Sequence, residues 1–325
     1  MNTNLNLPKI SIAPMMEWTD RHFRYFMRLI TKRTLLYTEM ISTGVILKGD
    51  RVRYLSYSLN ELPLAIQLGG DNPDDLANSA RIAEDFGYSE VNLNIGCPSN
   101  KVVKGNFGAC LMANPELVSR CISKMKSKVK IPVTVKHRIG IDNLEKYEDL
   151  RNFVKIVAES GCDRFIVHAR IAILKGLSPS ENRTIPPLRY QDVYKLKKDF
   201  PELKIEINGG ITEYSQFDTH FLNTDGIMIG RKAYEDPYFF SKIDKMVFHS
   251  EEIISSRKDV ILQLVPYIEE YTKNGGKANH ILRHVLGLFH GLSGAKNFRR
   301  TLSENMYMET DIKKLISSAI EKIEV

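Results

Sequence analysis

Short, β-rich apolar runs alternate with amphipathic stretches along most of this chain, and no other feature restricts its fold so strongly. Helical patterns at residues 74–86, 115–128 and 150–160 lie between such runs, and Pro follows Asn72 and Asn114 at the first helical position. We predict strands at residues 10–13, 35–39, 64–67, 90–94, 133–136, 164–168, 204–208 and 226–229.

Near-continuous apolar strands, each followed by a helical pattern, are typical of a parallel sheet covered on both faces, and eight such units close into a barrel. We therefore expect an α/β fold, a (β/α)8 TIM barrel over residues 1–245. An open doubly wound sheet is the alternative, but no GxGxxG motif follows the first predicted strand.

The pattern changes from about Ser250, where strand signals stop and helical periodicity dominates. The helical stretches are residues 260–271, 280–290, 296–304 and 311–323. They predict a small C-terminal helical bundle domain over residues 250–325, joined to the barrel through residues 242–256.

The composition suits a folded domain, since 43% of the 325 residues are hydrophobic and 26% are charged. No apolar run approaches the ~18–20 residues that cross a bilayer, and MNTNLNLPKI lacks a signal-peptide pattern, so we expect a cytoplasmic protein with no membrane partner. The cysteines show no CxxC pair or metal-ligand spacing, which favours free thiols and no metal site. A net charge of +7 favours an anionic partner without identifying it, and no obligate protein partner is expected.

Polar residues end most of the predicted strands, where a barrel places its active site. A single polar strand end could simply meet solvent, but several on one rim would face a shared cavity. The strand ends are Pro14-Met15, Glu39, Gln67, Asn94, Lys136, His168, Asn208 and Gly230-Arg231.

Glycines after the last two strands, in Asn208-Gly209-Gly210 and Gly230-Arg231, favour a phosphate site, because backbone N–H groups can approach an anion there. With Lys136 and His168 as cationic donors nearby, flavin mononucleotide (FMN) fits this corner. Gln67 and the backbone of Pro14, Met15 and Met16 could hydrogen-bond the rest of the ring. These residues alone do not separate FMN from another phosphorylated ligand.

The segment VNLNIGCP at residues 91–98, followed by Gly108 and Ala109, resembles the tRNA-dihydrouridine synthases. Further motifs follow the family's order: Ala13-Pro14-Met15, Gln67-Leu68-Gly69, Val135-Lys136, His168-Ala169-Arg170, Asn208-Gly209-Gly210 and Ile229-Gly230-Arg231. The chain is most similar to the bacterial A branch, which modifies uridines 20 and 20a. That similarity lies in Trp18-Thr19-Asp20-Arg21, Tyr37-Thr38-Glu39-Met40, GLSP at 176–179, ENR at 181–183 and HVLGLF at 284–289.

This resemblance implies an FMN enzyme that reduces uridine in the tRNA D-loop. NADPH reduces the flavin, N5 delivers hydride to C6 of the uracil, and Cys97 protonates C5. A thiol is a modest acid, which suits that role. Alternatively, Cys97 could be a buried structural thiol. We interpret Cys110, Cys121 and Cys162 as structural thiols of this kind.

The resemblance also implies tRNA contacts at Asn94, Ser180, Arg183, Lys296 and Arg299, with Arg300 beside the last. Ser180 departs from the branch, where a basic residue is usual, and His137 replaces a commoner threonine, so its role near the flavin stays open. The glycines and lysines of residues 101–108 suit a loop that closes over substrate.

Two other functions fit parts of this pattern. An FMN barrel that acts on a free pyrimidine, as in dihydroorotate oxidation, would use a similar flavin corner. A non-enzymatic RNA-binding barrel would keep the fold without the reaction. The C-terminal helical segment and its cluster of Lys296, Arg299 and Arg300 favour tRNA as the partner.

Overall fold

The computed structural model describes residues 9–99, 102 and 105–324. The chain forms two compact units. The first contains Met1–Met15, Leu35–Tyr57 and Leu62–Gly230, and the second contains Met16–Thr34, Ser58–Glu61 and Arg231–Val325. The domain limits expected from sequence, 1–245 and 250–325, stay a prediction.

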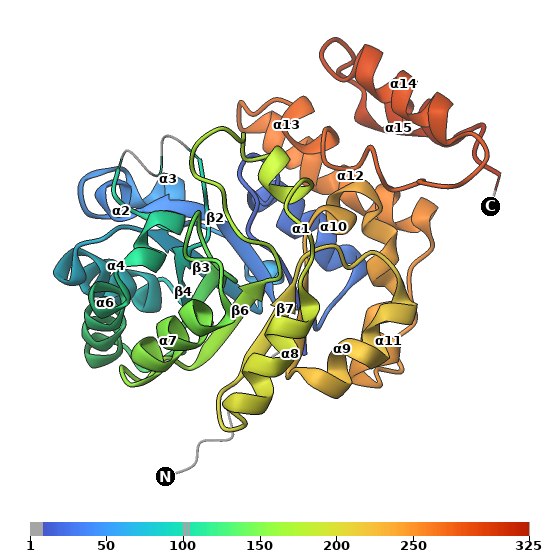
Figure 1. Ribbon diagram of the computed structural model, residues 1–325. Coiled ribbons are helices and arrows are strands. Elements are labelled where there is room, and N and C mark those ends of the chain that lie inside the picture. The colour runs from blue at the N-terminus through green and yellow to red at the C-terminus, as the bar shows by residue number, and fades with distance from the viewer. Residues whose placement is uncertain (1–8, 100–101, 103–104, 325) are drawn as a thin grey trace. The chain divides into compact units, whose positions relative to one another are not determined.

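The first unit holds an eight-stranded parallel sheet whose order is β1-β8-β7-β6-β5-β4-β3-β2 (Figure 1). A parallel bridge between Ser11 and Leu35 joins the first edge to the second and closes the barrel. The strands are β1 Ile10–Ile12, β2 Leu36–Ser42, β3 Leu64–Gly69, β4 Glu90–Ile95, β5 Val133–Arg138, β6 Arg164–His168, β7 Ile205–Asn208 and β8 Gly226–Ile229. The predicted (β/α)8 barrel is confirmed.

Helices between the strands cover the outside of this barrel (Figure 1). They are α2 Thr43–Lys48, α3 Arg51–Leu55, α4 Pro73–Asp85, α6 Pro115–Lys128, α7 Tyr147–Ala158, α8 Tyr190–Asp199 and α9 Phe217–Asn223, with 3-10 turns η2 Gly108–Ala113, η3 Glu181–Arg183 and η4 Tyr214–Gln216. Asn72 and Asn114 cap α4 and α6 by accepting backbone N–H groups, so both helix starts are confirmed.

The second unit is helical in its described part. Its elements are α1 Arg21–Ile30, η1 Leu59–Glu61, α10 Arg231–Glu235, η5 Pro237–Lys242, α11 Ile243–Phe248, α12 Arg257–Lys273, α13 Asn279–Leu282, α14 Ala295–Asn305 and α15 Ile312–Ile320. The predicted C-terminal helices are therefore present. Asp20 ties this unit together, because one oxygen caps α1 while the other lies 2.6 Å from Arg283 Nη2 and 3.0 Å from His284 Nε2.

The helix predicted over residues 280–290 is wrong beyond its first residues. Residues after α13 form tight turns, in which the N–H groups of Leu288 and His290 bond to carbonyls three residues earlier. A Cβ at Gly287 would come within 2.7 Å of the Glu235 carbonyl oxygen. The chain here packs closely against the backbone of α10. This contact prevents the regular helix that the apolar periodicity predicts.

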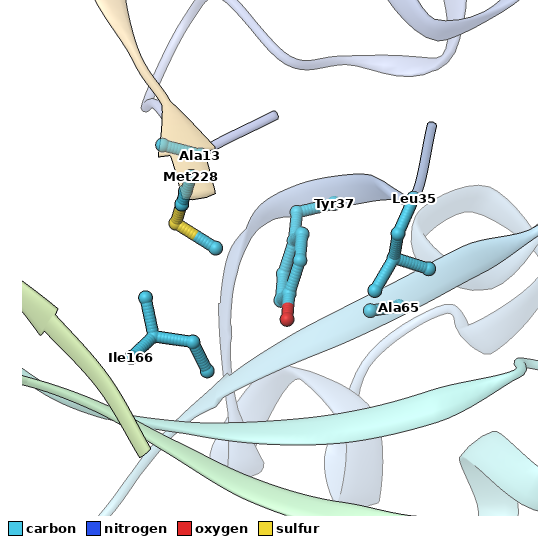
Figure 2. Close-up of a cluster of buried hydrophobic side chains, with 6 residues drawn as sticks. All are labelled: Ala13, Leu35, Tyr37, Ala65, Ile166 and Met228. Atoms are coloured by element: carbon cyan, nitrogen blue, oxygen red, sulfur yellow. The ribbon is translucent and has the colours of Figure 1, made fainter. Parts of the chain in front are cut away.

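Apolar side chains fill part of the barrel interior (Figure 2). They are Ala13, Leu35, Tyr37, Ala65, Ile166 and Met228. The Tyr37 hydroxyl is polar and donates to Glu90 Oε1 at 2.6 Å. The apolar cluster therefore borders a polar one.

That polar cluster is an ion network at the N-terminal ends of the strands. Arg164 Nη2 lies 2.7 Å from Glu90 Oε2, and Arg164 Nε lies 3.0 Å from Glu206 Oε2. All three side chains are buried. Burial disfavours the guanidinium charge, but Glu90, Tyr37 and Glu206 together outweigh this, so the pKa of Arg164 lies above its ordinary value.

Replacing Arg164 by Met would leave Glu90 and Glu206 buried without a cation. We expect the free energy of unfolding to fall by ~3–5 kcal/mol. Urea denaturation measures this loss. Arg81→Met is the matched control, because Arg81 is exposed and its ion pairs on α4 contribute at most ~1 kcal/mol. Equal losses in the two variants would contradict a structural role for the buried network.

Candidate active site

Polar side chains at the C-terminal ends of neighbouring strands meet inside the barrel. Gln67 of β3 accepts a hydrogen bond at Oε1 from Asn94 Nδ2 of β4, at 2.8 Å. Lys136 Nζ of β5 donates to Asn208 Oδ1 of β7 at 3.0 Å. The structure thus brings together four of the strand-end residues singled out by sequence.

Cys97 follows β4 in a turn held from several directions. The backbone N–H groups of Gly96 and Cys97 donate to Asn94 Oδ1, at 3.1 and 3.0 Å. The Cys97 carbonyl accepts the N–H of Ala109 at 2.9 Å. Gly108 has a φ of +76°, and a Cβ there would lie 2.7 Å from the Cys97 carbonyl oxygen. The trailing glycine is therefore needed for the chain to pass the half-buried Cys97.

Arg138 also holds this turn, and sequence reasoning missed it. Its Nε donates to the Gly96 carbonyl at 3.0 Å, while its Nη1 donates to the carbonyls of Ile171 and Asn182. The signal was available, because Arg138 lies two residues after Lys136 on the same face of β5. Asn182 sits inside the ENR motif and connects it to the Cys97 turn through Arg138.

Asn94 has less capacity for RNA than the resemblance implied. Its Oδ1 already accepts two backbone N–H groups, and one of its Nδ2 hydrogens goes to Gln67. The side chain is also buried. One N–H of the amide is left to reach a substrate.

Lys136 is half-buried, and its loss of contact with water lowers its pKa to about 8, an effect to which the nearby Arg138 charge adds. Its partner Asn208 is oriented in turn, since Asn208 Nδ2 donates to the Met228 carbonyl at 2.8 Å. Burial likewise lowers the pKa of His168 well below its ordinary value, so the ring is neutral. A cation and a neutral imidazole thus lie on adjacent strands.

Gly209 and Gly210 form a tight turn beside His168. Their φ values are +113° and +67°, and a Cβ at Gly209 would lie 3.2 Å from His168 Nε2. The Tyr190 hydroxyl donates to the Gly209 carbonyl at 2.7 Å. The positive φ values and the close neighbours therefore require glycine at both positions of this turn, which follows β7, where barrels often bind phosphate.

The C-terminal ends of β1 and β8 lie next in the barrel after the Gly209-Gly210 turn of β7. Ala13 N–H donates to the Ile229 carbonyl at 2.9 Å. A Cβ at Gly230 would lie 3.8 Å from Ala13 Cβ and 3.9 Å from Met15 Sδ, so protein contacts alone do not demand glycine there. A ligand that lies against the Gly230 backbone would explain why glycine is present there. Pro14 and Met15 lie next to Gly230.

The chemistry of the donor set tests whether a flavin fits. His168 ends β6 and is only half-buried, so its ring can meet a ligand at the rim. A cationic Lys136, a polar Gln67 and a double-glycine turn complete the set. These donors fit an anionic, ring-bearing cofactor.

Other predicted residues are not among the side chains joined by these hydrogen bonds. Ser180 and Arg183 are exposed at η3 of the first unit. Met16, Arg231, Lys296, Arg299 and Arg300 belong to the second unit. Lys101 and Lys104 of the predicted closing loop lie outside the described residues.

His137 does not face the barrel interior. It is buried against Phe153 of α7, with ring centroids 5.0 Å apart, and burial lowers its pKa to about 4. It is a neutral packing residue on the helical side of β5.

Of the other three thiols, Cys121 is buried, while Cys110 and Cys162 are half-buried, so a structural role for all three stays a prediction. All four cysteines are free, and burial raises the pKa of Cys121 and of Cys162 to about 12. Burial also raises the pKa of Cys110. Within the described ranges, no group of His, Cys, Asp and Glu side chains could hold a metal ion. No helix of that part of the chain has the length and apolar character to cross a bilayer.

Comparison with known proteins agrees with this geometry. A 2-naphthoyl-CoA reductase complex has the same fold at a TM-score of 0.56, with 10% identity, covering 73% of this chain and 50% of that one. The tRNA-dihydrouridine(20/20a) synthase of Synechocystis is 56% identical, covering 96% of this chain and 93% of that protein. Its Shewanella oneidensis counterpart is 54% identical, covering 94% and 92%. The dihydrouridine synthase model matches residues 11–324, so the chain belongs to the dihydrouridine synthase family.

Proposed function

We propose that this protein reduces uridine to 5,6-dihydrouridine at positions 20 and 20a of the tRNA D-loop, with bound FMN and with NADPH as reductant. Its family and the names of its relatives support this. The observation that carries the proposal is the Cys97 turn, held at the rim of the same barrel end as Lys136 and His168.

Each residue of that end has a task in this proposal. Lys136, His168, Asn208, Gly209 and Gly210 hold the flavin, which supplies hydride when bound. Gln67 and the segment Pro14, Met15 and Met16 complete its binding, together with Gly230 and Arg231.

Cys97 donates a proton from Sγ to C5 of the uracil. A uridine within tRNA must leave its stack to reach the barrel end, and that step needs protein contacts to RNA phosphates. We assign those contacts to Ser180 and Arg183 beside the barrel and to Lys296, Arg299 and Arg300 on α14.

Cys97→Ala tests the proton donor. We expect dihydrouridine formation to fall by ~10²–10⁴-fold, while NADPH still reduces the flavin, because only the second half of the reaction needs the thiol. Mass spectrometry of tRNA from cells lacking this protein, incubated with each variant, measures the product. Cys162→Ala is the control, since the Cys162 thiol donates to the Arg164 carbonyl at the N-terminal end of β6, the opposite end of the strand from His168. Reduction of free uridine but not of tRNA would favour the free-pyrimidine alternative instead.

Lys136 predicts how FMN binding depends on pH. Its pKa is about 8 without ligand, so its positive charge is present below that pH and lost above it. We expect FMN affinity to weaken as the pH rises through about 8, and Lys136→Met to remove that dependence. Fluorescence titration at pH 7, 8 and 9 measures it. A steep native-like slope in Lys136→Met would show that another group controls FMN binding.

Lys296 and Arg299 test the RNA contacts on α14. Both are exposed, while Phe298 beside them is buried, so the helix presents its charges to solvent. Lys296→Ala with Arg299→Ala should weaken tRNA binding and reduce the slope of log affinity against log salt by about 1 for each phosphate left without its cation. Lys313→Ala with Lys314→Ala removes the same charge from α15. Equal effects of the two pairs would indicate a nonspecific response to charge.

A further inference from the structure

A chain of side-chain hydrogen bonds runs through the barrel from the buried ion network to Cys97. It begins at Glu90, which accepts from the Thr134 hydroxyl at 2.6 Å. Thr134 Oγ1 accepts from Asn92 Nδ2 at 2.9 Å, and Asn92 Oδ1 accepts from Gln67 Nε2 at 2.8 Å. Gln67 and Asn94 then complete the path to the Cys97 N–H.

In every hydrogen bond of this chain the donor is the group nearer to Cys97. The backbone N–H groups at the Cys97 end are enough to fix this direction. Backbone N–H groups can only donate, so the Asn94 oxygen must face Gly96 and Cys97. The Asn94 amide nitrogen must then face Gln67, and the same reasoning orients Gln67 and Asn92. Thr134 is left to donate its proton onward, and its acceptor is the Glu90 carboxylate.

The far end of the chain is fixed independently. Glu90 accepts from Arg164 Nη2, at 2.7 Å to Oε2, and from the Tyr37 hydroxyl at 2.6 Å. The path is also dry, since Asn92 and Thr134 are fully buried and Gln67 is 1% exposed. Water cannot replace a missing partner in such a place, so a break leaves a donor or acceptor unpaired.

We propose that Thr134 and Asn92 are positioning residues that, through Gln67 and Asn94, hold the Cys97 turn in place for proton delivery. This inference rests on the proposed function for the role of the thiol. Neither residue reaches the rim itself. Thr134 fixes which way the Asn92 amide points, Asn92 fixes Gln67, and Gln67 fixes the amide on which the Cys97 turn is built.

Thr134→Val tests this idea, because valine has nearly the same shape but has no hydroxyl. The Asn92 amide would lose its acceptor and turn to find another, which disturbs Gln67 and then the bonds from Asn94 to the turn. Thr134→Ser restores a hydroxyl and should restore the native behaviour. Thr224→Val is the matched control, because the Thr224 hydroxyl is also buried but bonds the His220 and Gly226 carbonyls before β8.

Two readouts report on the turn. Iodoacetamide alkylation of Cys97, followed peptide by peptide, needs no substrate, and the buried Cys121 of α6 in the same sample is an internal reference for general loosening of the fold. We expect Thr134→Val to speed Cys97 alkylation about tenfold, the effect of removing one buried hydrogen bond. Single-turnover uridine reduction should slow by a similar factor at saturating FMN, while flavin reduction by NADPH and the reactions of Thr134→Ser and Thr224→Val stay near native.

Unchanged alkylation and uridine reduction in a folded Thr134→Val protein would overturn the proposal. So would an equal loss in Thr134→Ser, which would assign Thr134 to packing. Melting temperatures separate these results from unfolding, since Thr134→Val and Thr224→Val should lose similar stability. If the native protein forms no dihydrouridine, the proposed function fails, and the alkylation rates alone still decide whether Thr134 holds the turn.

Discussion

The pairing of Arg164 with two buried carboxylates is the interaction on which the barrel interior depends. Glu90 and Glu206 lie on strands β4 and β7, and Arg164 lies on β6 between β5 and β7. Isolated carboxylates in this place would be very costly, so the guanidinium makes a polar interior tolerable. Once Glu90 is compensated, it can serve as the terminal acceptor for the hydrogen bonds above it.

The interior thus has a continuous polar side and an apolar side. The polar side rises from Glu90 through Asn92 to Asn94, and the apolar side contains Tyr37, Ile166 and their neighbours. The polar side ends at the C-terminal rim, where amides, Lys136 and the Cys97 turn meet. Hydrogen bonds deep in the barrel therefore fix the orientation of the polar groups at the C-terminal rim, where a ligand can meet them.

Much of this arrangement could be predicted from the sequence. The apolar runs located all eight strands, and the residues that end them included Gln67, Lys136 and Asn208, because alternation along a strand and the barrel rule need only local information. Arg138 was missed because the predicted strand ended at Lys136, whereas β5 continues to Arg138. The Asn92–Thr134 bond was missed because it depends on register between strands, which the sequence does not display. The helix expected over residues 280–290 was wrong because a close backbone approach at Gly287 is a tertiary constraint. The tRNA contacts and cofactor remain proposals.

The alternation along β4 has a consequence for how the chain folds. Parallel strands buried on both faces are often apolar throughout, and such strands can slide by one residue at little cost. Here Glu90, Asn92 and Asn94 alternate with the fully buried Val91, Leu93 and Ile95. A slip of one position would place three polar groups under the helices and three aliphatic groups in the polar part of the barrel interior. The polar interior therefore makes a one-residue shift of β4 energetically costly, and this favours the native register over misfolded barrels.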